Sequence, residues 1–132
     1  MEFDIDPDDA QQLNRLLVIR TDREKKLRRQ LTEHQRARET LYLLSQSLQD
    51  DRNKIIAKQV QQEVPQAALT PTEFVRFKLI LAKDYQQERT LAQKLLSNKL
   101  KIDDLTMKMD ILTVDIKKLA KAQEKLKVIL DE

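Results

Sequence analysis

Few residues of this sequence could act as catalytic groups or metal ligands, and their spacing does not bring any of them together with a second such residue. The chain has one histidine, His34, and no cysteine, so disulfides and thiolate metal sites are excluded. No second ligand type clusters near His34, which favours a structural role over that of a base or metal ligand. Asp103, Asp104 and Asp110 could suggest a cation site, but adjacent acids on a helix point to different faces. We therefore predict no catalytic, cofactor or metal site, and a protein that is not an enzyme.

A basic band runs from Arg20 to Arg38, where eight lysines or arginines stand against three acids. Such a band could bind nucleic acid. However, the bases surround the expected helix instead of forming one stripe, and no aromatic side chain lies among them to stack on nucleotides. We therefore expect the band to meet an acidic protein surface, and we expect no nucleic-acid partner.

Apolar residues beyond the needs of a helix seam occur near both ends of the sequence. The first group is Leu16, Leu17, Val18 and Ile19, and the second is Val128, Ile129 and Leu130. Four consecutive apolar residues wrap a helix on all sides, and a seam between two helices buries only about half of them. If the chain folds back on itself, both groups lie at one tip. We expect this tip to insert into another protein, and ordinary surface exposure is the alternative.

The composition indicates long solvated helices. The chain of 132 residues contains no glycine, where about nine would be average, so folds that depend on tight glycine turns, such as barrels, P-loops and Rossmann folds, are disfavoured. Charged residues make up 36% and aromatic residues 4%, which leaves little for a thick core. No apolar run approaches the roughly 20 residues of a membrane span, and the acidic start differs from a signal peptide. We expect a cytoplasmic protein without direct membrane insertion.

The second half of the sequence has the clearest periodicity. One column of a seven-residue repeat contains Phe74, Leu81, Leu95, Ile102, Met109, Ile116 and Leu130. The column three residues later contains Phe77, Leu91, Leu105, Leu112, Leu119 and Leu126. The polar members of this seam are Asp84, Glu88, Asn98 and Gln123. A repeat sustained this long predicts a helix in a coiled coil, from about residue 70 to about residue 131.

The first half predicts another long helix, from about residue 7 to about residue 63, after a frayed lead over residues 1–6. Asp6 can cap its free amides, and Pro7 fits the first helical position. One apolar column contains Leu13, Leu27, Leu41, Leu48 and Ile55. Its companion column divides between Leu17 and Leu31, four residues on, and Leu16, Ala37 and Leu44, three residues on. We expect a broad seam that wanders along the helix, with looser packing in its charged middle.

A turn over residues 64–69 separates the two helices. Pro65 ends the first helix near residue 63. Thr70, Pro71 and Glu73 predict the start of the second, with a capping box between Thr70 and Glu73. Leu69 and Phe74 are placed to form a hydrophobic staple across this start.

Helices of equal length joined by a short turn favour an antiparallel arrangement. We predict an all-α fold in which two long helices form an antiparallel coiled-coil hairpin, a single domain over residues 1–132. A turn near residue 68 would place Arg52 opposite Asp84 and Arg38 near Asn98. Self-association of the second helix with copies of itself is the alternative source of a partner helix.

Residues 16–27, Leu-Leu-Val-Ile-Arg-Thr-Asp-Arg-Glu-Lys-Lys-Leu, resemble the opening of the YscO/FliJ-type stalk proteins of bacterial type III secretion and flagellar export. Their pattern is a leucine-rich turn, an Arg-x-x-Arg-Glu run and repeated basic residues. Lys25 and Lys26 stand where the family often has alanine. The plan of two long helices in a small glycine-poor chain is similar as well.

The resemblance implies a central stalk whose tip enters the pore of a hexameric export ATPase. It also implies contact with an export-gate protein at the inner membrane, and with secretion chaperones. The implied tip residues are Leu16, Leu17, Val18, Ile19, Val128, Ile129 and Leu130. The residues implied to face acidic ring surfaces are Arg20, Arg23, Arg28 and Arg29. We expect a cytoplasmic protein associated with the secretion apparatus, and a monomer when isolated.

Two other classes of protein remain as alternatives. A prefoldin-like chaperone would hold clients between helical tips, but prefoldin subunits carry strands between their helices, and residues 64–69 are too short and too proline-interrupted for a strand hairpin. A structural tether or dimeric spacer is the third interpretation. A stoichiometric hetero-hexamer would favour the chaperone, and a parallel homodimer would favour the spacer.

Overall fold

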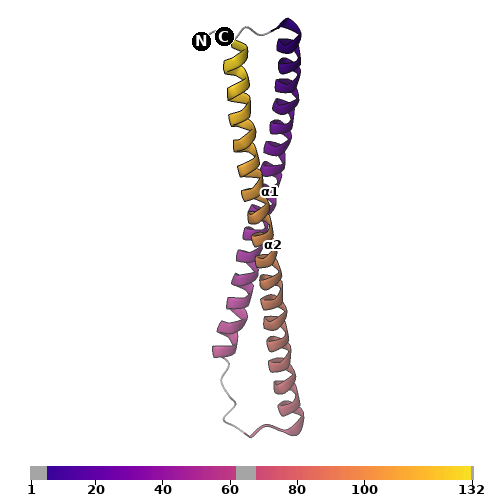
Figure 1. Cartoon of the computed structure of the whole chain (residues 1–132). Coiled ribbons are helices and arrows are strands. Elements are labelled where there is room, and N and C mark those ends of the chain that lie inside the picture. Colours follow the sequence, from indigo (N-terminus) through magenta and orange to yellow (C-terminus); the bar gives the residue numbers. More distant parts are fainter. Residues whose placement is uncertain (1–5, 62–67, 132) are drawn as a thin grey trace. The chain divides into compact units, whose positions relative to one another are not determined.

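Two long helices account for nearly all of the described chain. The structure, a computed structural model, describes residues 6–61 and 68–131 (Figure 1). Helix α1 spans Pro7–Gln61 and helix α2 spans Pro71–Asp131, with no strand in the described residues. The predicted all-α fold, an antiparallel hairpin of two long helices, is confirmed. The predicted frayed lead at 1–5, the end of the first helix at 62–63 and the turn at 64–67 lie outside the described residues.

The helices pack against each other in two compact units, which are described one at a time. Unit 1 combines residues 6–38 of the α1 side with residues 104–131 of α2. Unit 2 combines residues 39–61 with residues 68–103. In each unit a part of α1 lies along an oppositely directed part of α2.

Both helices begin with the predicted caps. The Asp6 carboxylate accepts a hydrogen bond from the Asp8 amide at 3.2 Å. At the start of α2 the Glu73 amide donates to the Thr70 hydroxyl at 3.2 Å, and the Thr70 amide donates to the Glu73 carboxylate at 3.2 Å. This reciprocal pair is a capping box, which satisfies two amides that have no partner within the helix.

Removing the cap of α2 should cost stability. Thr70→Ala deletes the hydroxyl that accepts from Glu73, and we expect the free energy of unfolding to fall by about 1 kcal/mol. Urea unfolding followed by circular dichroism at 222 nm measures this change. Thr72→Ala is the matched control, because Thr72 lies in the same first turn and is exposed. Equal effects of the two substitutions would contradict a stabilising role for the capping box.

The seam of α2 runs as predicted from Phe77 to Leu130. The residues of the two predicted columns in this range are buried or half-buried, while most of the residues between them are exposed. Its most deeply buried apolar residues are Ile102, Met109, Ile116 and Leu126. Phe74 differs from the prediction: its ring is about half exposed, and the Lys78 ammonium lies 4.5 Å from the ring centre. The apolar core is therefore a thin line of α2 side chains.

The seam of α1 is more regular than its apolar residues suggested. Half-buried positions alternate at spacings of four and three residues: Leu13, Leu17, Arg20, Glu24, Leu27, Leu31, His34, Arg38, Leu41, Ser45, Leu48, Arg52, Ile55 and Gln59. Leu16, Ala37 and Leu44 are exposed. The prediction of a wandering seam was wrong, because polar side chains fill the companion column wherever an apolar residue is missing from it.

Polar pairs cross the helix contact of unit 2. The Arg52 guanidinium donates to the Glu88 carboxylate at 3.1 and 3.2 Å. The Lys58 ammonium lies 3.4 Å from the buried Asp84 carboxylate. The Asn98 amide donates to the Ser45 hydroxyl at 3.5 Å. Each polar seam residue of α2 in this unit therefore meets a polar partner from α1, and the rising numbers on one helix with falling numbers on the other show the antiparallel direction.

These pairs correct the predicted register. Arg52 was predicted opposite Asp84 and pairs with Glu88, four residues further along α2. In unit 1, Arg38 was predicted near Asn98 and donates to the Thr106 hydroxyl at 3.2 Å, eight residues further along. The physical reason is the repeat itself: sliding one helix by about seven residues returns its seam to the same face. The apolar pattern is therefore compatible with both registers, and the polar pairs distinguish them.

Candidate protein-binding site

The apolar residues near the start of α1 divide between the seam and the surface. Leu17 and Arg20 occupy seam positions and are half-buried. Val18 is 60% exposed and Ile19 is 63% exposed. Leu16 lies beside the seam and is 36% exposed. Two large aliphatic side chains therefore stand on the outer surface of α1, as expected when four apolar residues follow one another on a helix.

Val18 and Ile19 line a shallow groove on the outer surface of α1. The other residues of the groove are Gln11, Asn14 and Arg15. All three polar residues are exposed and precede Val18 and Ile19 along α1, so the groove has a polar part followed by an apolar part. Protein-binding patches combine apolar and polar residues in this way.

The apolar residues near the end of α2 divide in the same way. Leu130 belongs to the seam, and Ile129 beside it is half-buried. Val128 is 55% exposed. A second groove is lined by Val128 and Ile129 together with Glu124 and Lys125. Val128 is thus the member of this group that a partner reaches most readily.

Unit 1 brings both apolar groups to the same end. Arg23 and Leu27 of α1 line one groove with Asp115 and Leu119 of α2. Continuing this antiparallel alignment by one heptad towards the start of α1 places residues 16–20 level with about residues 122–126 of α2. Val128 follows directly. The two outer grooves share no lining residue, so the end of unit 1 has an apolar patch on each helix.

The four predicted basic residues have different surroundings. Arg20 is half-buried in the seam, whereas Arg23, Arg28 and Arg29 are exposed. The Arg28 guanidinium binds the Glu24 carboxylate at 2.8 Å. Arg23 lies with Asp115 in the groove between the helices. Arg23, Arg28 and Arg29 are therefore the members of this set that an acidic partner surface can reach.

Sequence reasoning missed a group of exposed apolar residues on α2. Met107, Ile111 and Val114 are among the large apolar side chains that the structure exposes. Their spacing of four and three residues marks one helix face. This signal was present in the sequence but was hidden by the stronger seam, which repeats at the same spacing on another face.

The residues considered for chemistry have the surroundings of ordinary helix residues. His34 is half-buried in the seam of α1, and the Asp104 carboxylate binds Lys108 of its own helix at 3.0 Å. In the part of the chain that the structure describes, no three His, Cys, Asp or Glu residues gather as metal ligands would. Neither described helix contains a stretch long and apolar enough to cross a membrane.

Comparisons with known proteins neither add to the resemblance found in the sequence nor contradict it. The chain matched no protein-family model, no curated protein and no solved structure. The resemblance to YscO/FliJ-type stalk proteins therefore rests on residues 16–27 and on the helical plan.

Proposed function

We propose that this chain is a non-enzymatic stalk subunit of a type III secretion export apparatus. Its tip inserts into the pore of a hexameric export ATPase, stimulates that ATPase and links it to the export gate. The observation that carries the proposal is the apolar end of unit 1, where Val18, Ile19 and Val128 are each more than half exposed. Large exposed apolar patches on a helical tip are typical of a surface that another protein covers.

The antiparallel hairpin is suited to such a role. A pair of helices inside a sixfold ring cannot contact six identical subunits in the same way. Its contacts therefore differ from subunit to subunit, and differential contacts shift the conformational equilibrium of each subunit unequally. This asymmetry would favour ATP hydrolysis in one subunit at a time without any catalytic group on the stalk.

The exposed arginines support a ring partner with acidic surfaces. Arg23 and Arg29 lie about one and about three turns of helix beyond the apolar patch of α1, and both are exposed. Arginine pairs with carboxylates through two parallel hydrogen bonds. In the proposed complex the apolar patch occupies the pore, and these guanidinium groups meet carboxylates at its rim.

The proposal is tested by affinity capture from the native cell with the full chain as bait. We expect a hexamer-forming secretion ATPase among the captured proteins, and we expect the purified chain to raise its rate of ATP hydrolysis. Recovery of unfolded clients or prefoldin-like subunits without an ATPase would overturn the proposal. A captured ATPase whose turnover is unchanged by the chain would limit the role to that of a tether.

A further inference from the structure

Within unit 1, α2 has an exposed apolar stripe outside its seam, and Ile111 of this stripe also lines a groove that α2 forms with His34 of α1. Met107 is 67% exposed, Ile111 is 60% exposed and Val114 is 50% exposed. The seam residues between them, Met109 and Leu112, are buried or half-buried against α1. When a helix has two apolar faces, a single partner helix covers one of them and the other stays exposed to solvent. The hairpin therefore leaves this stripe uncovered.

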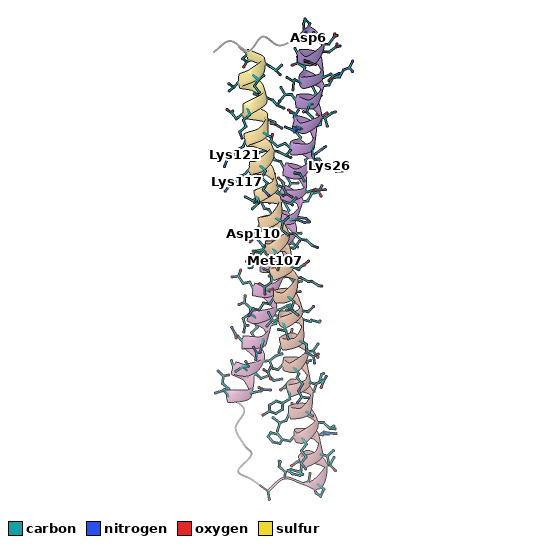
Figure 2. The ribbon with its side chains drawn as sticks, in the orientation of Figure 1. Asp6, Lys26, Met107, Asp110, Lys117 and Lys121 are labelled. Carbon is teal, nitrogen blue, oxygen red and sulfur yellow. The ribbon has the colours of Figure 1, made fainter. Side chains whose placement is uncertain are left out.

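Charged residues flank the stripe, and the sign of their charge changes along the helix. Asp104 and Asp110 precede its centre, whereas Lys117, Lys118 and Lys121 follow it, and all five are exposed. Met107, Asp110, Lys117 and Lys121 follow one another along α2 in Figure 2, and Lys117 and Lys121 project away from α1. Lys108 and Asp115, which are also exposed, lie along the other flank of the stripe in the reverse order of charge. Each flank therefore carries both signs of charge and is complementary to itself when the helix is reversed.

We propose that this face binds a second copy of the chain, with the two α2 helices antiparallel across a twofold axis. Ile111 of each copy then packs on Val114 of the other, at the centre of the contact. Moving outward by the heptad spacing, Met107 meets the stem of Lys118, and Asp104 meets Lys121. Twofold symmetry makes each of these contacts occur twice.

The flanking positions agree with the same register. Asp110 of one copy lies beside Lys117 of the other, on the edge of the apolar contact. Opposite charges at such flanking positions set partner choice and direction in helix pairs. Asp104 keeps most of its side chain exposed, at 62%, even while it binds Lys108, so it remains available to a second copy.

The charges favour the antiparallel direction over the parallel one. A parallel pair in register would place each residue of the stripe beside its own copy. Asp104 would then face Asp104, Lys118 would face Lys118, and Lys121 would face Lys121, and like charges at such distances repel. The antiparallel pair replaces these repulsions by attractions between acidic and basic residues.

The interface is short, and its strength follows from its size. Residues 104–121 span about 27 Å of helix, and each copy contributes three exposed apolar side chains. Contacts of this size are weak and transient. We infer a dimer that forms as concentration rises and weakens with salt, because exposed ion pairs are screened. The proposed dimer differs from the monomer in isolation that is expected from the sequence, and the oligomeric state in solution distinguishes the two.

Charge exchange between two exposed positions tests the proposal. Lys117→Asp brings a second carboxylate beside Asp110 of the other copy, and Asp110→Lys brings a second ammonium beside Lys117. We expect each to weaken dimerisation of the full chain by about tenfold or more, as measured by sedimentation equilibrium at low salt. The double variant Asp110→Lys with Lys117→Asp restores opposite charges and should return the dimer to the wild-type level.

Lys26→Asp is the matched control, because Lys26 is an exposed lysine on α1 in the same unit and lies outside the proposed face. It should leave the association unchanged. A wild-type chain that stays monomeric at all accessible concentrations would overturn the proposal. So would single variants that dimerise like the wild type, or a double variant that remains monomeric.

The direction of the pair has a separate test, since the sequence contains no cysteine. Met107→Cys chains are mixed with Lys118→Cys chains and treated with a short thiol cross-linker. The antiparallel pair should give cross-linked products that contain one chain of each kind, well above either homodimer. A predominance of products that join two identical chains would show a parallel pair and contradict the proposal.

Discussion

Replacing Ile116 by alanine is expected to lower the free energy of unfolding by about 2–3 kcal/mol. Ile116 is 6% exposed and belongs to the small set of apolar residues that the helix contact buries deeply. The loss combines the transfer free energy of the deleted methyl groups with the void left between the helices. In a two-helix hairpin no further layer of side chains can collapse into that void. Urea unfolding followed by helical circular dichroism measures the change.

Ile19→Ala is the matched control for this prediction. It deletes the same atoms from the same unit, but Ile19 is 63% exposed, and surface substitutions of this kind change stability by about 0.5 kcal/mol or less. We expect the midpoint of unfolding to fall clearly for the buried isoleucine and to stay near the wild type for the exposed one. Equal shifts would mean that burial along the α2 seam is not what stabilises the hairpin.

The structure of α2 could be predicted well from the sequence because most of its seam positions carry apolar residues. From Phe77 to Leu130 twelve of the sixteen seam positions carry Leu, Ile, Met or Phe, and the period of the pattern fixes the buried face. In the first half the same seam carries Arg20, Glu24 and other polar residues. Apolar residues alone therefore do not identify the seam of α1, although the seam positions keep their regular spacing.

The register could not be obtained from periodicity. A slide of one heptad leaves the two apolar seams facing each other, so the energy difference between registers lies in a few polar layers and in the length of the turn. The pairs Ser45–Asn98 and Lys58–Asp84 supply that information. Neither pair is evident in advance, because serine and lysine are common on exposed helix surfaces as well.

The candidate site was predicted in part. The four consecutive apolar residues indicated that some must be exposed, and the structure identifies Val18 and Ile19 as the most exposed of them, ahead of Leu16 at 36%. Which two of the four face outward depends on the phase of the α1 seam, which the sequence left ambiguous between Leu16 and Leu17. The exposed stripe of α2 was missed for a related reason. Its apolar residues repeat at the same spacing as those of the seam, so the sequence pattern does not separate the two faces.

If the chain stimulates a hexameric ATPase as proposed, replacing Val18 and Ile19 together by aspartate is expected to abolish that stimulation. Both side chains stand on the outer surface of α1, so the substitution should leave helix content and unfolding midpoint close to those of the wild type. In the proposed complex the same side chains enter an apolar contact, where two unpaired carboxylates cost at least about 3 kcal/mol. That loss corresponds to an affinity at least about 100-fold weaker.

The measurement is the rate of ATP hydrolysis by the captured ATPase as the chain is titrated into it. Leu43→Asp with Leu44→Asp is the matched control, because both residues are exposed aliphatic side chains of α1 but belong to unit 2. The control should stimulate hydrolysis like the wild type. If the Val18 and Ile19 variant stimulates equally well, the apolar end of unit 1 is not the inserted tip. If both variants fail although both remain helical, the contact extends along α1 and is not confined to its start. Loss of stimulation in the first variant alone would assign the ring contact to two side chains that the fold leaves on the outer surface of α1.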